Sequence, residues 1–185
     1  MQREERKKRY IKDFTLAFSE NGIDKTSIKK LAKAANINEA SIYQYFKNKD
    51  EIIVECVKQH FDNMKDELLP AVSDSKMTVD ERLAYVMQYS EAAADKDKFI
   101  YQVLANPLYS RMCAPIIDRF IDRMRSAGAR LSGELDIAED VMCPILFLFC
   151  STVSADRILN DEKVFSMQMN FLARLLKSKE LAGGR

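Results

Sequence analysis

Short polar side chains between Glu39 and Gln44 have the composition of a surface that reads nucleic acid. Carboxylate, hydroxyl and amide groups can hydrogen-bond to base edges in the major groove, and a methyl group can contact thymine. The four positions on the exposed side of a short predicted helix are Glu39, Ala40, Ser41 and Gln44. Three neighbouring side chains are placed where phosphates would run: Tyr43, Lys47 and Lys49.

Two short helices and a tight turn must position these residues. The sequence predicts a first helix over residues 3–21, a second over 28–34 and a third over 38–46. Thr26-Ser27 can cap the second helix, and Asn36 suits a left-handed turn before the third. Six apolar residues are placed to close a small core with the first helix: Ile28, Leu31, Ala32, Ile37, Ile42 and Phe46. This order predicts a helix-turn-helix whose last helix enters the major groove.

The charge is divided unevenly along the chain. Residues 1–50 hold twelve Lys or Arg against seven Asp or Glu, a net charge of +5, which leaves −4 for the rest of a chain whose total is +1. A basic head on an acidic body indicates that only the head contacts a polyanion, although a solvated surface has the same composition.

The stretch from Thr26 to Ile52, and above all its ending Tyr-x-Tyr-Phe-x-x-Lys-x-Glu-Ile, resembles the DNA-binding signature of the TetR (tetracycline-repressor-like) family. The resemblance covers about residues 8–55. It implies that Tyr43 and Lys49 hold phosphates, that Thr26 and Ser27 meet the DNA backbone, and that residues 39, 40, 41 and 44 face the bases. The chain departs from the family pattern at Asn36, where Gly is usual, and at Glu39, where Lys is common. A carboxylate at position 39 could accept a hydrogen bond from cytosine N4.

The rest of the chain is also predicted to be helical, because Gly and Pro are sparse. Further helices are predicted over residues 49–69, 78–94, 99–105, 115–131, 137–159 and 162–178. Pro70 is expected to end the first of these, and Pro115 to lie in the first turn of the fourth. The predicted fold is all-α, with nine or ten helices and no strands. Residues 1–49 form a three-helix DNA-binding head, which a long helix joins to a ligand-binding and dimerisation domain over residues 50–185.

The last two predicted helices carry apolar stripes that favour a homodimer interface. Family members pair there as a four-helix bundle. The interface residues expected are Ile145, Leu148, Thr152, Phe165, Met169, Leu172 and Leu176. The alternative is that these faces close the core of a monomer.

The central helices are rich in aromatic and sulfur-containing side chains, which suit a mostly apolar small-molecule effector. The residues expected to line a pocket are His60, Met64, Tyr85, Tyr89, Phe99, Tyr101, Met112, Phe120, Met124 and Phe147. Ordinary core packing explains many of them equally well. His60, the single histidine, falls on an apolar stripe; it is either a hydrogen-bonded core residue or a contact through which a ligand moves the head.

Enzyme, metal and membrane functions find little support in the sequence. One histidine cannot supply a di-iron bundle, and phosphate-binding glycine loops and nucleophile elbows are absent. The four cysteines, at positions 56, 113, 143 and 150, form no C-x-x-C pair and are expected to be buried free thiols in the cytoplasm. No cofactor and no membrane contact are expected.

Two functions follow from these observations. The first is a DNA-binding transcriptional regulator, most simply a repressor that an effector releases from a palindromic double-stranded operator. The second is a dimeric helical scaffold whose head docks on a protein rather than on DNA.

Overall fold

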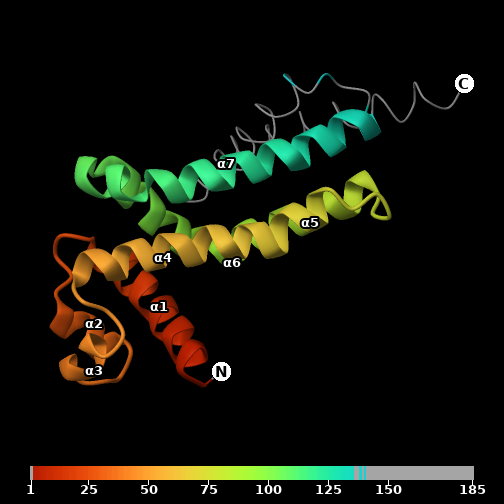
Figure 1. The fold of residues 1–185 in the computed structure, drawn as a ribbon. Helices are drawn as coiled ribbons and strands as arrows, with labels where there is room; N and C mark the ends of the chain where they lie inside the picture. Colours follow the sequence, from red (N-terminus) through yellow and green to blue (C-terminus); the bar gives the residue numbers. More distant parts are fainter. Residues whose placement is uncertain (1, 136–137, 139, 141–185) are drawn as a thin grey trace, which may run out of the picture. The chain divides into compact units, whose positions relative to one another are not determined.

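The computed structural model describes residues 2–135, 138 and 140, and this part of the chain is helical without a strand. The elements are α1 (Gln2–Asn21), α2 (Ile28–Ala34), α3 (Glu39–Tyr43), α4 (Lys49–Asn63), the π-helix η1 (Met64–Leu68), α5 (Leu69–Val72), α6 (Val79–Ala105) and α7 (Pro107–Leu135) (Figure 1). The all-α prediction is confirmed. The last two predicted helices lie outside the described residues.

The chain divides into two compact units. The first, called the head unit below, comprises Met1–Asp62 and Asp95–Asp118; the second comprises Asn63–Ala94 and the chain from Arg119 onward. None of the described helices is long and apolar enough to cross a membrane.

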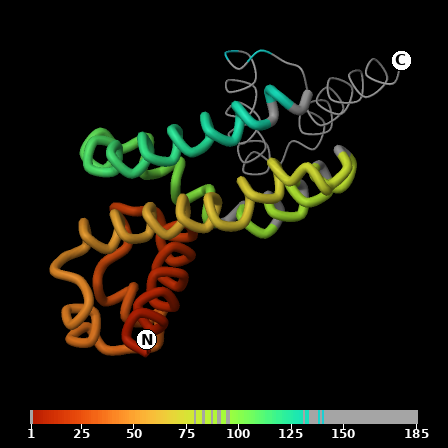
Figure 2. Tube along the Cα trace, turned by 45° about the vertical axis from the view of Figure 1, so that its right-hand side comes forward, coloured from red at the N-terminus to blue at the C-terminus, as the bar shows by residue number. Residues whose placement is uncertain are grey.

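The core of the head unit is built around aromatic and branched side chains from α1 to α4. Leu31, Ala32, Ile42 and Phe46 are buried, and Ile28 and Ile37 are partly buried against them, as the apolar pattern predicts. The first helix lies against the first half of α4 (Figure 2), where the Cys56 thiol donates to the Ile11 carbonyl at 3.7 Å. Five residues from α6 and α7 complete the same core: Phe99, Ile100, Val103, Tyr109 and Cys113.

The sixth helix is continuous, so the prediction of separate helices over residues 78–94 and 99–105 is wrong. The charged run Asp95–Lys98 resembles a solvated break in the sequence. It instead occupies one turn of α6, in which Lys98 is exposed while Asp97 is buried. A tertiary partner for one carboxylate, described below, therefore decides the helix here.

The seventh helix begins at Pro107, not at Pro115 as predicted. The Asn106 side chain caps it, because its Oδ1 accepts hydrogen bonds from the backbone N–H groups of residues 108 and 109 at 3.0 and 3.3 Å. A proline in the first turn loses no helical hydrogen bond, which makes Pro107 the favoured start. The helix continues through Pro115.

Two further boundaries differ from the prediction. Helical structure does not stop at Pro70, because the wider π-turns of η1 precede it and α5 continues to Val72. The third helix is shorter than expected: it ends at Tyr43, with Gln44 as its C-cap, rather than at Phe46.

Candidate nucleic-acid interface

The turn between α2 and α3 has the geometry of a Schellman motif. The N–H of Asn36 donates to the Lys33 carbonyl at 3.2 Å, and the N–H of Ile37 donates to the Ala32 carbonyl at 2.9 Å. Asn36 has a φ of 53°, which asparagine accepts more readily than most residues. The predicted exchange of Gly for Asn at this position therefore keeps the turn intact.

Side-chain caps begin each of the three elements that follow the first helix. The Ser27 hydroxyl accepts from the Lys30 N–H at 3.3 Å, and Asn38 Oδ1 accepts from the Ser41 N–H at 2.7 Å. At α4, Asn48 Oδ1 accepts from the Glu51 N–H at 2.8 Å, while Glu51 Oε2 accepts from the N–H of Lys47 at 2.6 Å. This reciprocal pair is a capping box with Asn in the Ser/Thr position, and it fixes where α4 starts relative to α3.

The four predicted base-reading residues lie together on or just after α3. Glu39, Ala40 and Gln44 are exposed, and Ser41 is half-buried. The Ser41 hydroxyl also donates to Asn38 Oδ1 at 2.9 Å, so it is oriented from within the head. The arrangement offers one carboxylate, one methyl, one hydroxyl and one amide to a groove.

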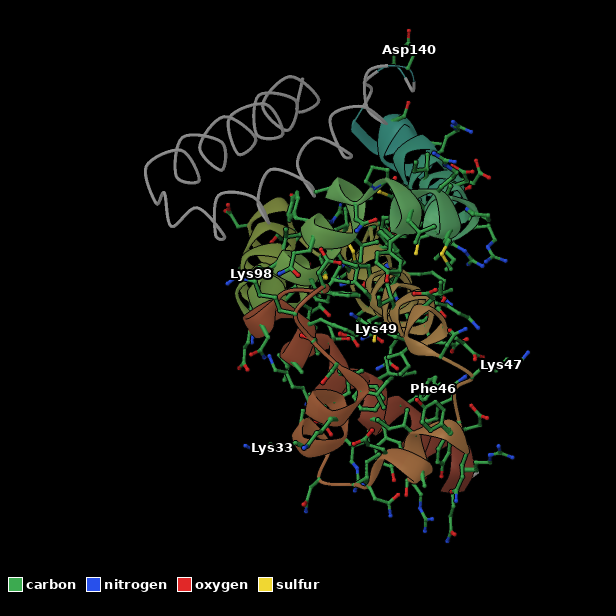
Figure 3. All side chains as sticks on the ribbon, turned by 90° about the vertical axis from the view of Figure 1, so that its left-hand side faces the viewer. Lys33, Phe46, Lys47, Lys49, Lys98 and Asp140 are labelled. Carbon is green, nitrogen blue, oxygen red and sulfur yellow. The ribbon has the colours of Figure 1, made fainter. Side chains whose placement is uncertain are left out.

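The predicted phosphate-binding residues flank this group. Tyr43 is 56% exposed, unusual for an aromatic side chain next to a core, and Ser27 and Lys47 are exposed. Lys49 is half-buried. Figure 3 shows Phe46 within the head and the side chains of Lys33 and Lys47 extending away from it.

Thr26 does not fit its predicted role. Its side chain is fully buried, and its hydroxyl donates to the Gly22 carbonyl at 2.7 Å. It therefore joins the loop after α1 to α2, and its hydroxyl is not open to a phosphate. The neighbouring Ser27 keeps the exposed position.

The sixth and seventh helices hold the head at two points that the sequence pattern did not indicate. The Gln102 amide bridges the end of α1: its Oε1 accepts from the Ile23 N–H at 3.1 Å, and its Nε2 donates to the Ser19 carbonyl at 3.3 Å. The Tyr109 hydroxyl donates to Asp50 Oδ1, in the first turn of α4, at 3.0 Å. Burial and this carboxylate raise the pKa of Tyr109 to about 12. No local periodicity marks a glutamine or a tyrosine for such contacts.

His60 is buried in the head unit, as its apolar stripe predicts. Its Nε2 lies 3.5 Å from Oδ1 of Asp97, which is also buried, and its ring meets Phe61 edge to face. Burial, and then the charge of Lys96, lower the pKa of His60 to about 4, so the imidazole is neutral at pH 7. This pair joins α4 to α6.

The residues predicted to line an effector pocket fall into both units. Phe99 is fully buried in the head unit, where its ring stacks on Phe18 at 5.5 Å between centroids, so it is a core residue. Met112 is 39% exposed and Tyr101 half-buried. The second unit contains Met64, Tyr85 and Tyr89, which are half-buried, and Phe120 and Met124, which are buried.

Several predictions concern residues outside the described part of the chain. These are Phe147 of the pocket and all seven dimer-interface positions from Ile145 to Leu176. Cys56 and Cys113 are buried free thiols, and burial raises the pKa of Cys56 to about 12, which suppresses its thiolate. Among the described residues, no group of His, Cys, Asp and Glu side chains is arranged to hold a metal ion.

Comparisons with known proteins identify the region around this interface. Residues 17–56 match the family described as bacterial regulatory proteins, tetR family. The chain is 27% identical over 100 residues to the biofilm operon icaADBC negative transcriptional regulator IcaR of Staphylococcus aureus, a match that covers 54% of each chain. The chain thus spans about half the length of the curated relatives it matches.

Solved structures show the same fold over most of the chain. A TetR-family regulator structure from Mesorhizobium loti covers 98% of both chains with a TM-score of 0.71 and 13% identity. The regulator FadR from Bacillus subtilis, solved in complex with stearoyl-CoA, covers 91% of this chain and 96% of its own, with a TM-score of 0.66 and 19% identity. At these identities the likeness concerns the fold.

Proposed function

Since residues 17–56 make this chain a member of the tetR family of bacterial regulatory proteins, we propose that it is a repressor that leaves a palindromic operator when an effector binds. The observation that carries this proposal is the exposed group on and after α3. Glu39, Ala40 and Gln44 face solvent beside Tyr43 and Lys47, on a helix whose both ends are fixed by caps. A symmetric dimer would present this group to two half-sites one helical turn apart.

The test begins by selecting duplexes from a random library with the full chain. The operator proposal expects a palindrome to be enriched, and Gln44→Ala to weaken binding to it while leaving a shuffled duplex unaffected. Lys47→Ala should instead weaken both duplexes and reduce the salt slope by about 0.9, the value for one phosphate contact. A chain that enriches no sequence would favour the scaffold whose head docks on a protein.

For the effector we propose a mostly apolar molecule held by side chains of the second unit. Buried Phe120 and Met124 with half-buried Met64, Tyr85 and Tyr89 are the soft, adaptable lining such a ligand prefers. The stearoyl-CoA found with the B. subtilis regulator makes an acyl-CoA the first compound to assay.

Two methionines of α7 give a matched pair for this assay. Met124→Ala should raise the concentration of stearoyl-CoA that releases the selected palindrome, because Met124 is buried in the second unit. Met112→Ala should leave it unchanged, because Met112 is 39% exposed and lies in the head unit. Equal shifts in both variants would remove Met124 from the effector site.

For assembly we propose a homodimer formed through residues 137–159 and 162–178, and for location the cytoplasm, where an operator would lie. The basis is the apolar stripe of both segments and the need to grip two half-sites. Sedimentation at micromolar concentration tests it: a monomeric mass, alone and with the palindrome, would contradict the dimer.

A further inference from the structure

The basic residues at the start of α1 do not share one role. Two of them, spaced four apart on one face of the helix, contact the segment that links α3 to α4. Arg3 Nη2 donates to the Gln44 carbonyl at 3.0 Å, and its guanidinium lies 5.5 Å from the centre of the Tyr45 ring. Lys7 Nζ lies 2.9 Å from Glu55 Oε2 and 5.4 Å from the centre of the Phe46 ring.

The same face of α1 continues with aromatic contacts to the same two rings. Tyr10 meets Tyr45 edge to face at 5.4 Å, and Phe14 meets Phe46 at 5.8 Å between centroids. The contacts at positions 3, 7, 10 and 14 follow helical spacing, so they form one continuous seam. The seam ends with Arg3, the member nearest the base-reading residues.

A helix as short as α3 cannot define its own orientation. It has five residues, and isolated helices of this length are unstable in water. Its N-terminal end is capped by Asn38 from within the helix-turn-helix. Its C-terminal end is held from outside: Gln44 is the C-cap, and the charged group on its carbonyl is Arg3. A cation at this end also complements the helix dipole.

We propose that Arg3 is a positioning residue for sequence-specific DNA binding, which holds the C-terminal end of α3 so that Gln44 and its neighbours enter the groove in one orientation. Arg3 acts through the Gln44 carbonyl and the Tyr45 ring rather than on DNA. Its contribution therefore belongs to recognition of the correct sequence. This inference rests on the proposed DNA binding.

The competing role for an exposed arginine at this place is a direct phosphate contact, and salt dependence separates the two. A phosphate contact contributes about 0.9 to the slope of log affinity against log salt and acts on every duplex. A positioning residue changes the affinity for the selected duplex and leaves the slope and the affinity for a shuffled duplex unchanged.

The experiment compares Arg3→Ala, Arg3→Lys and Arg6→Ala with the wild-type chain. Arg6 is the matched control, because it has the same charge and is exposed on the same helix. The probes are the palindrome selected by the wild-type chain and a shuffled duplex of equal composition, each titrated at several salt concentrations. Thermal unfolding of each variant sets an assay temperature at which all are folded.

Arg3→Ala should lose about 3- to 10-fold in affinity for the palindrome, the value of one hydrogen bond, with an unchanged slope and unchanged binding to the shuffled duplex. Arg3→Lys should recover part of this loss, since an ammonium can still donate to the Gln44 carbonyl. Arg6→Ala should leave the ratio of the two affinities unchanged.

Equal losses on both duplexes with a lower slope would assign Arg3 to a phosphate and overturn the inference. An Arg3→Ala variant that binds the palindrome like the wild type would overturn it as well, while leaving the proposed function standing. A wild-type chain that selects no sequence would overturn both.

Discussion

Replacing Phe99 with alanine should destabilise the DNA-binding head, although Phe99 lies about fifty residues beyond it in sequence. The side chain is fully buried and stacks on Phe18 of α1 at 5.5 Å. Removing a buried phenylalanine costs about 3–5 kcal/mol, through lost burial and the cavity left behind. For a chain of this size that corresponds to a fall in Tm of roughly 6–20 °C.

The assay is urea unfolding together with amide hydrogen exchange of α1 and α2. Exchange in these helices should accelerate in Phe99→Ala, because their core loses a member from α6. Leu104→Ala is the matched control: it changes an apolar residue of the same helix that is 43% exposed, and its effect should stay below about 1 kcal/mol. If both variants unfold at the same urea concentration, or if exchange in α1 is unchanged, then Phe99 does not belong to the core of the head.

Three smaller predictions follow from single residues. Stability should fall as the pH falls from 6.5 towards 4, because the unfolded chain protonates His60 in this range while burial holds its folded pKa at about 4; urea midpoints should show this, and His60→Gln should flatten the dependence. A rise in stability over the same range would mean that His60 is charged beside Asp97. Asn36→Gly should be nearly neutral and Asn36→Ala should lose about 1 kcal/mol, because a φ of 53° strains a β-carbon; thermal unfolding measures both, and equal losses would refute the strain. Ser27→Ala should cost about 1 kcal/mol as a lost N-cap, whereas an unchanged Tm would show that the cap contributes little.

The parts of the head that could be predicted are those encoded locally. Apolar spacing, the caps at Ser27 and Asn38 and the left-handed turn at Asn36 depend on residues within a few positions of each other. They indicated α1 to α3 and the exposure of Glu39, Ala40 and Gln44. Local signals of this kind survive without knowledge of the fold.

The features that could not be predicted depend on distant partners. Asp97 looks like a solvated charge until His60 is placed beside it, and Thr26 looks like an exposed cap until its hydroxyl meets Gly22. Arg3 is one of several similar cations in the sequence, and only its contact with the Gln44 carbonyl distinguishes it. The predicted domain boundary after residue 49 was likewise drawn along the chain, and it stays a prediction.

The contribution of Asp95–Asp118 to the head unit has a consequence for how such regulators could be recombined. A chimera that joined residues 1–49 of this chain to a foreign body would leave Phe18 without Phe99, and would leave Ile23 and Ser19 without the Gln102 amide. A graft that also carried residues 95–118 would keep these contacts. The unit of exchange between relatives is therefore discontinuous in the gene, and changes of operator preference should accumulate more readily by substitution on α3 than by swapping of whole N-terminal segments.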